Sequence, residues 1–205
     1  MKTFLFQGDS ITDADRDRDC DVKLGLGYPN LVAAEIGFKY PGEFRFINKG
    51  ISGDRSTSVY NRIYTDIINL SPDCMSILIG VNDIWHGING ENGVSDERYE
   101  QILTMLMEDI FEKLPDIKIA VLEPFVLKGP ATQDNWDKFD TGVRNIAKKA
   151  KAVADKFGLI YVPHQDKFDE LSKKAPVECW LTDGVHPAPA GHELIAKELI
   201  KAFDL

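Results

Sequence analysis

The stretch Cys74-Met75-Ser76-Ile77-Leu78-Ile79-Gly80-Val81 lies near the middle of the chain and is almost continuously apolar. A run of this length and character is typical of a strand whose two faces are both covered, as in a parallel sheet. We therefore predict a central strand over residues 74–81. Four further apolar runs are its expected neighbours, at residues 3–7, 44–48, 118–122 and 159–162.

Segments with helical periodicity separate these runs. Apolar residues recur at steps of three and four in the ranges 99–114, 136–157 and 194–203. Ser95 precedes the first of them and is its expected N-cap. Strands that alternate with helices indicate an α/β protein, in which a parallel sheet carries helices on both faces.

Length, charge and cysteine content narrow the class of protein. The 205 residues contain no repeat, low-complexity tract or linker, so we expect a single domain over residues 1–205. A net charge of −9 makes nucleic acid and anionic membranes poor partners. No stretch resembles a secretory signal or a membrane span, and Cys20, Cys74 and Cys179 lack disulfide or zinc spacing. A cytoplasmic, reduced protein is expected.

Four short motifs follow predicted strands or precede the last helix. They are Gly8-Asp9-Ser10-Ile11, Asn48-Lys49-Gly50-Ile51-Ser52-Gly53-Asp54-Arg55, Gly80-Val81-Asn82-Asp83 and Asp183-Gly184-Val185-His186-Pro187. In an α/β sheet the reactive groups lie at the carboxyl ends of the strands. All four motifs could therefore converge on one edge of the sheet, although they lie far apart in sequence.

These motifs contain the groups that serine-dependent ester hydrolysis requires. Ser10 supplies a hydroxyl, His186 an imidazole, and Asp183 can reach the other ring nitrogen if its segment makes a single turn. Gly53 offers an unobstructed N–H and Asn82 an amide, both suited to a developing oxyanion. Each motif alone is more often an ordinary turn, so the hypothesis depends on their joint occurrence. This chemistry needs no metal and no cofactor.

Together the four motifs resemble the sequence blocks of the SGNH hydrolase superfamily, also called the GDSL esterases and lipases, with Ile11 in place of the usual Leu. The resemblance implies a three-layer α/β/α sandwich with a central parallel five-stranded sheet, the flavodoxin-like fold of this superfamily. It implies a nucleophile, a general base and an orienting acid, which are Ser10, His186 and Asp183. The implied oxyanion hole consists of the Ser10 N–H, the Gly53 N–H and the Asn82 amide.

Longer strings, at residues 8–13, 26–28, 48–53 and 79–85, resemble the SGNH carbohydrate acetylesterases, including acetylxylan-esterase-like enzymes. This narrower resemblance implies a serine esterase that removes small acyl groups, above all acetyl, from a sugar or oligosaccharide. A lysophospholipase or thioesterase for longer acyl chains stays open, as does a non-catalytic flavodoxin-like module that binds a phosphorylated ligand. Relatives of this kind often self-associate, so a homo-oligomer is expected.

Several side chains near the motifs are candidate substrate contacts: Asp9, Tyr28, Arg55, Trp85 and Trp180. The three aromatic rings could stack on a sugar or pack in the core. Arg55 could hold a substrate oxygen or pair with Asp54 or Asp83, and Asp9 could brace the turn around Ser10. His192 has no acid three residues before it, so we expect a capping or packing role rather than that of the base.

Overall fold

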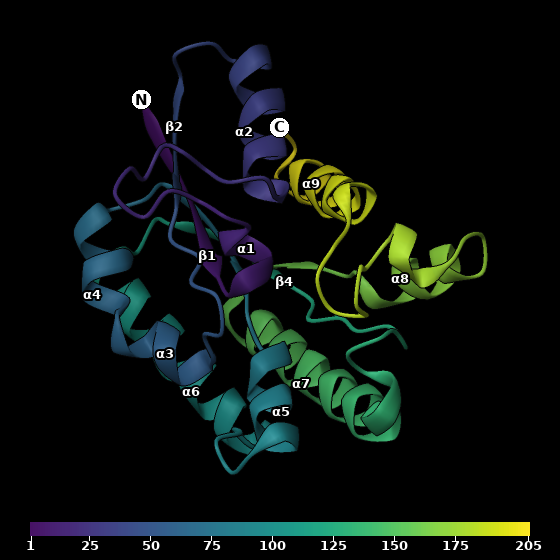
Figure 1. Ribbon diagram of the computed structural model, residues 1–205. Helices are drawn as coiled ribbons and strands as arrows, with labels where there is room; N and C mark the ends of the chain where they lie inside the picture. Colours follow the sequence, from purple (N-terminus) through teal and green to yellow (C-terminus); the bar gives the residue numbers. More distant parts are fainter.

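The computed structural model describes residues Met1–Leu205, and its core is one sheet of parallel strands with helices on both faces (Figure 1). The five strands follow the order β2-β1-β3-β4-β5. Doubly wound flavodoxin-like sheets have this order. The predicted α/β/α sandwich with a central parallel five-stranded sheet is therefore confirmed. The strands are β1 Lys2–Gly8, β2 Phe44–Asn48, β3 Cys74–Leu78, β4 Lys118–Leu122 and β5 Ile160–Val162.

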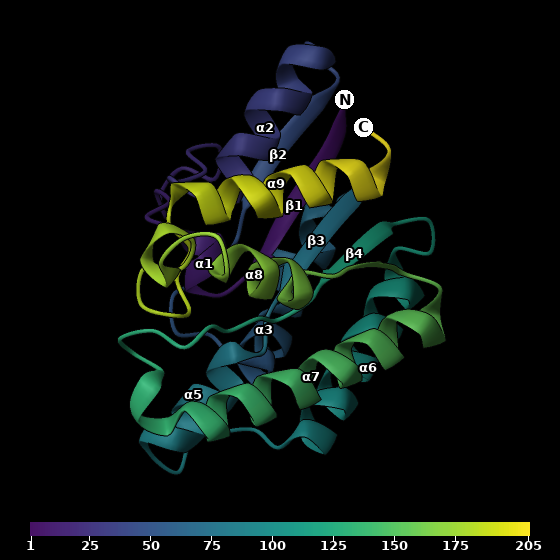
Figure 2. The same ribbon diagram turned by 90° about the vertical axis from the view of Figure 1, so that its right-hand side faces the viewer.

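The helices divide into two layers, which Figure 2 shows on either side of the sheet. On one face lie α2 Tyr28–Lys39, α8 Gln165–Ser172 and α9 Pro189–Phe203. On the other lie α3 Ser56–Asn61, α4 Ile63–Asp66, α6 Asp96–Lys113 and α7 Trp136–Phe157. The short α1 Ser10–Asp13 and α5 Val81–Asn89 follow β1 and β3, and single 3₁₀ turns occur at Ile68–Leu70, Gln133–Asn135 and Val177–Cys179.

Side chains of the inner strands alternate between two apolar clusters, because successive residues of a strand point to opposite faces. Phe4 and Phe6 of β1 pack with α2 and α9, whereas Leu5 packs with α6 and α7. Every residue of β3 is buried. Full burial of one such apolar side chain contributes about 1.5–3 kcal/mol, so these two clusters are a main source of stability.

The central strand is shorter than the sequence predicts. It ends at Leu78, and Val81 already begins α5. Gly80 makes this change of direction with a φ of +140°, which L side chains rarely adopt. The apolar run therefore extends beyond the strand and into α5, and Gly80 is the one residue of the run that indicates the turn between them.

The long helices agree with the periodicity better than the short ones do. The Ser95 side chain accepts a hydrogen bond from the Arg98 N–H and caps α6, as expected, and α7 spans the predicted range 136–157. The last helix begins at Pro189, before its apolar repeat starts, and β5 begins one residue later than predicted, at Ile160. The sequence did not single out α2, α3, α4, α5 or α8.

The strand order places a crevice at one end of the sheet. The chain moves from β1 to β2 on one side and then crosses to β3 on the other side. Ligands of doubly wound sheets bind outside the carboxyl ends of the strands at such a reversal. The loops that follow β1, β2 and β3 meet there.

None of the helices combines the length and the apolar character needed to cross a membrane.

We expect Gly80→Ala to destabilise the fold. A methyl group there would require the disfavoured φ and would lie 2.6 Å from Ile146 Cγ2. The backbone conformation alone costs about 1–3 kcal/mol. The matched control is Gly37→Ala in α2, where the added carbon would meet only Phe46 at 3.9 Å, so stability should rise by about 0.5–1 kcal/mol. Urea unfolding followed by circular dichroism measures both, and equal midpoints for the two variants would contradict this account.

Candidate active site

Ser10 is the first residue of α1, immediately after β1. Asp9 fixes this turn from within: its Oδ1 accepts a hydrogen bond of 3.0 Å from the Ile11 N–H. The Asp9 carbonyl also accepts from the Thr12 and Asp13 N–H groups. The N–H of Ser10 opens the helix and so has no intrahelical acceptor. The hydroxyl and the backbone N–H of one residue are thus both available at the carboxyl edge of the sheet.

A single tight turn before α9 brings Asp183 and His186 together. Asp183 Oδ1 accepts hydrogen bonds of 2.8 Å from the backbone N–H groups of Val185 and His186. The other oxygen, Oδ2, lies 2.7 Å from His186 Nδ1. The two residues therefore have the geometry that their spacing predicted.

The His186 ring reaches Ser10 from a distant part of the chain. Its Nε2 lies 2.9 Å from Ser10 Oγ. Because Nδ1 faces a carboxylate and donates its proton there, the neutral ring has Nε2 free to accept the hydroxyl proton. This is the arrangement of a serine, a histidine and an aspartate that can activate a hydroxyl for attack on an ester carbonyl.

The electrostatics of this pair favour a charged imidazole next to a charged carboxylate. Burial would raise the pKa of Asp183, but hydrogen bonds from the His186 ring and from two backbone N–H groups outweigh burial and hold that pKa at about 2. The hydrogen bond to Asp183 raises the pKa of His186 above its usual value of 6.5, although partial burial opposes it. An imidazole that takes up a proton is thereby stabilised.

Gly53 and Asn82 lie on the other side of Ser10. Together with Trp85, His86 and Asn89 they line a hollow of about 360 Å³, here called the Trp85 hollow, which Ser10 and His186 also border. Gly53 has a φ of +84°, which suits glycine and leaves no side chain over its N–H. Asn82 Nδ2 donates one hydrogen bond to the Asp54 carbonyl at 3.0 Å, so its second N–H remains available.

A second hollow, of about 460 Å³, adjoins Ser10 and His186 on the side of α1. Its lining includes Ile11, Leu26 and Pro187, and we call it the Leu26 hollow. The hydroxyl and the imidazole therefore lie between two open spaces, as an ester with an acyl side and an alcohol side would require. No cluster of three or more histidine, cysteine or acidic side chains is arranged to hold a metal ion.

The predicted aromatic contacts have different outcomes. Trp85 does border the site, with its ring centroid 5.9 Å from that of His186 and 5.7 Å from that of Phe139. Tyr28 is fully buried and its hydroxyl is 3.0 Å from Thr12 Oγ1, so the prediction that it contacts the substrate was wrong. Trp180 packs against the apolar core and lines neither hollow, and its indole Nε1 is buried. For Trp180 the structure therefore favours the packing alternative over stacking on a sugar.

The polar candidates need correction too. Arg55 donates from Nη1 to the carbonyl and side-chain oxygens of Asn92, at 2.6 and 2.8 Å. It lines neither hollow and pairs with neither Asp54 nor Asp83, because these acids are bound by other side chains. Asp9 is only 1% exposed, so it braces the turn and does not contact a substrate.

The remaining histidines are not placed as bases. His192 is buried, and its Nδ1 accepts a hydrogen bond of 3.2 Å from the Tyr28 N–H at the start of α2. Burial lowers the pKa of His192 to about 4, which keeps this acceptor neutral. His192 thus has one of the two roles expected of it, capping or packing, but the N–H group that it caps belongs to α2 and not to its own helix. Sequence reasoning missed two residues of the Trp85 hollow, His86 and Asn89. They follow Asn82 by four and seven residues on α5, and this helical spacing could have indicated that they share its face.

Known proteins with a similar sequence are ester hydrolases. Residues 6–194 match the model of the GDSL-like lipase/acylhydrolase family. An acetylxylan esterase from Geobacillus stearothermophilus is 31% identical over 207 residues, which cover 96% of this chain and 91% of that protein.

Solved structures resemble the whole chain. A protein assigned as a GDSL-like lipase from Parabacteroides merdae has a TM-score of 0.94 at 36% identity, over 99% of this chain and 95% of that one. The acetylxylan esterase Axe2 from G. stearothermophilus has a TM-score of 0.87 at 30% identity, over 100% and 94%. Three similar structures are catalytic mutants of Axe2, in which alanine replaces an aspartate, a serine or a histidine.

Asp9 gives a prediction about pH and stability. Burial raises its pKa to about 7, although the Ile11 N–H lowers it in part, and its Oδ2 has no hydrogen-bond partner. The folded protein thus prefers the protonated acid, so the stability that Asp9 contributes is lost as the pH rises from about 4 to about 7. Asp9→Asn mimics the neutral form. Its advantage in unfolding free energy over the wild type should therefore grow by roughly 2 kcal/mol as the pH rises from 5 to 8.

The control for this prediction is the exposed Asp15, which should show no such gain as Asp15→Asn. Thermal or urea unfolding of the three proteins at both pH values measures the difference. A gap between Asp9→Asn and the wild type that is the same at pH 5 and pH 8 would show that Asp9 is not protonated in the fold.

Proposed function

Since the chain belongs to the GDSL-like lipase/acylhydrolase family and is a carboxylic ester hydrolase, we propose that it removes acetyl groups from carbohydrate esters through an acyl-serine intermediate. The observation that carries the mechanism is the contact of 2.9 Å between Ser10 Oγ and His186 Nε2, with Asp183 behind the ring. Family membership also excludes the non-catalytic binding module.

In the proposed first step, Ser10 Oγ attacks the ester carbonyl while His186 Nε2 takes up the hydroxyl proton. The carbonyl oxygen becomes negatively charged and accepts hydrogen bonds from the Ser10 N–H, the Gly53 N–H and the free N–H of Asn82. Preorganised donors of this kind each contribute about 10²–10³-fold to kcat. Asp183 holds the ring in the tautomer that accepts the proton and stabilises the imidazolium that results.

In the second step the tetrahedral intermediate collapses. The bond between the carbonyl carbon and the sugar oxygen breaks, and His186 donates its proton to that oxygen, which leaves as the alcohol. Water then attacks the acetyl-Ser10 ester with His186 as base, and the bond to Ser10 Oγ breaks to release acetate. The serine hydroxyl regains its proton from His186, which restores the starting state.

The relatives support this assignment of roles. The catalytic mutants of Axe2 change a serine, an aspartate and a histidine, and the last two lie three positions apart, as Asp183 and His186 do here. The support for an acetylated carbohydrate comes from the acetylxylan esterase relative and from Trp85, an aromatic side chain at the edge of the site.

One observation favours a second candidate, an esterase or thioesterase for longer acyl chains. The Leu26 hollow is larger than an acetyl group needs, and part of its lining is apolar, with Leu26 itself 79% exposed. A medium acyl chain in this hollow would cover such surface. Chain-length preference separates the two candidates.

We expect kcat/KM on p-nitrophenyl esters to be highest for acetyl and to fall steeply as the acyl chain lengthens toward dodecanoyl. Ser10→Ala is the blank and should abolish turnover at every length. A maximum at eight carbons or more would move the substrate to longer acyl esters, and hydrolysis that survives in Ser10→Ala would overturn the acyl-serine mechanism.

The dependence of kcat/KM on pH should reveal the link between Asp183 and His186. Only the neutral imidazole can accept a proton, and Asp183 raises its pKa, so the acid limb of the wild type should have its midpoint above pH 6.5. Asp183→Asn should move that midpoint to lower pH and reduce kcat by about 10⁴-fold. Asp15→Asn, at the edge of the Leu26 hollow, serves as the control and should leave the midpoint unchanged. An unshifted limb in Asp183→Asn would argue against His186 as the base.

A further inference from the structure

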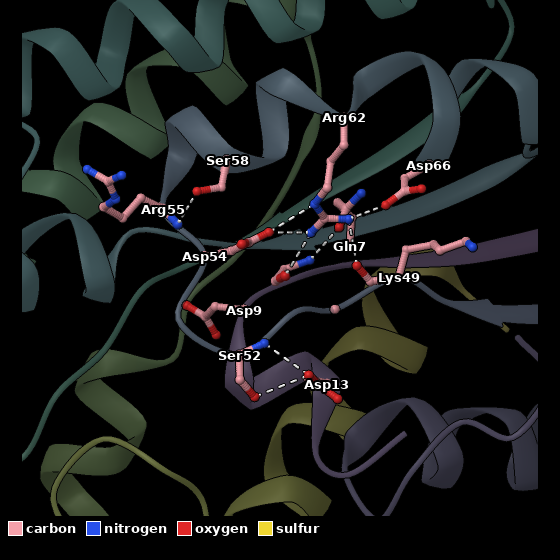
Figure 3. Close-up of polar contacts among 12 residues, drawn as sticks. Gln7, Asp9, Asp13, Lys49, Ser52, Asp54, Arg55, Ser58, Arg62 and Asp66 are labelled. Carbon is pink, nitrogen blue, oxygen red and sulfur yellow. Dashed lines mark hydrogen bonds and ion pairs between the residues drawn. The ribbon is translucent and has the colours of Figure 1, made fainter. Parts of the chain in front are cut away.

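Arg62 lies between α3 and α4, and its side chain is only 12% exposed. Its guanidinium group binds two carboxylates, as Figure 3 shows. Nε and Nη2 lie 2.9 and 2.7 Å from Asp54 Oδ2, and Nη1 lies 2.6 Å from Asp66 Oδ2. Nη1 and Nη2 also donate to the backbone carbonyls of Lys49 and Gly8, at 2.8 and 3.3 Å. One planar cation therefore ties the end of β1 to the segment that follows β2.

Two acceptors of Arg62, Gly8 and Asp54, lie within two residues of a proposed oxyanion donor. Gly8 precedes the turn that carries Ser10, and Asp54 directly follows Gly53. The Asp54 carbonyl in turn accepts the hydrogen bond from Asn82 Nδ2. The Gly53 N–H and the Asn82 amide are thus connected to the guanidinium through Asp54 alone, and the Ser10 N–H is connected to it through Gly8 and Asp9.

Charge gives Arg62 a second role in the same place. The acids Asp9, Asp54 and Asp83 surround the donors, and burial raises the pKa of Asp54 while Arg62 opposes that rise. An unpaired carboxylate beside Gly53 would repel a developing oxyanion. The fork of hydrogen bonds from Arg62 neutralises Asp54 and fixes its orientation, which a lysine could do only in part.

We propose that Arg62 is a positioning residue for the oxyanion hole. It holds the Gly53 N–H and the Asn82 amide in place through Asp54, without touching the substrate. This inference rests on the proposed function, because it assigns Gly53 and Asn82 to the transition state. A purely structural Arg62 would affect stability and leave the rate of the folded enzyme unchanged.

The test compares Arg62→Met with Arg144→Met on p-nitrophenyl acetate. Arg144 is a matched control, because it also binds two carboxylates, Asp140 and Asp169 at 2.7 and 3.0 Å, but joins α7 to α8 away from the site. We expect Arg62→Met to lower kcat by about 10–10³-fold with KM changed less than about threefold. Arg144→Met should keep kcat. Arg62→Lys, which retains the charge, should recover part of the loss.

A boronic acid provides a readout that a structural role would not move. Its adduct with Ser10 is tetrahedral and anionic, so its inhibition constant should rise in Arg62→Met in parallel with the loss of kcat. Melting temperatures establish that each variant is folded at the assay temperature. If Arg62→Met is unfolded there, the same comparison is made with Arg62→Lys, for which an unchanged kcat and inhibition constant would overturn the proposal.

The outcomes separate this inference from the proposed function. Hydrolysis that persists in Ser10→Ala would mean that the proposed mechanism fails. Hydrolysis that depends on Ser10 but is unaltered in folded Arg62→Met, with unchanged boronic acid inhibition, would overturn the role of Arg62 alone. Equal losses of kcat in Arg62→Met and Arg144→Met would also overturn it, because they would reflect general destabilisation.

Discussion

The pairing of β1 with both β2 and β3 is the constraint on which the rest of the site depends. It brings the carboxyl ends of three parallel strands side by side, so the loops after them share one small volume. Ser10 opens α1 after β1, Gly53 lies in the loop after β2, and Asn82 lies in the first turn of α5 after β3. Hydrogen bonds along the strands, formed over residues far from the site, thereby set the spacing of the reacting groups.

Only the turn with Asp183 and His186 comes from outside this frame, and it is built to be rigid by itself. One carboxylate satisfies two backbone N–H groups and the imidazole, so the ring orientation follows from the local chain. Other backbone bonds dock the turn on the loop after β4, where Leu127 and Ala131 donate to Gly184 and Asp183. Local order and docking together account for a contact of 2.9 Å between residues 176 positions apart.

The sequence predicted the sheet and the four motifs because their signals are local. An apolar run marks β3, and a glycine or an acid marks each turn. It failed where partners lie far apart in the chain. Tyr28 sits in a motif-like string, yet its ring is buried against Phe6 of β1. Arg55 binds Asn92, a residue that no spacing rule connects to it. The network of Arg62 was invisible for the same reason: Asp66 lies four residues away, but the other three acceptors, Gly8, Lys49 and Asp54, come together with Arg62 only in the folded chain.

Chemistry and specificity depend on different parts of this molecule. The proposed reacting groups are held by backbone hydrogen bonds and by the acids Asp9 and Asp54, whose side chains accept hydrogen bonds from the Ile11 N–H and from Arg62. The Trp85 and Leu26 hollows, in contrast, are also bordered by side chains such as Asn89 and Leu26, which belong neither to the proposed triad nor to the proposed oxyanion hole. We expect substitutions of these side chains to alter the shape offered to a substrate while Ser10 and His186 keep their places. A relative that is 30% identical can therefore share the fold over its whole length while its choice of ester differs.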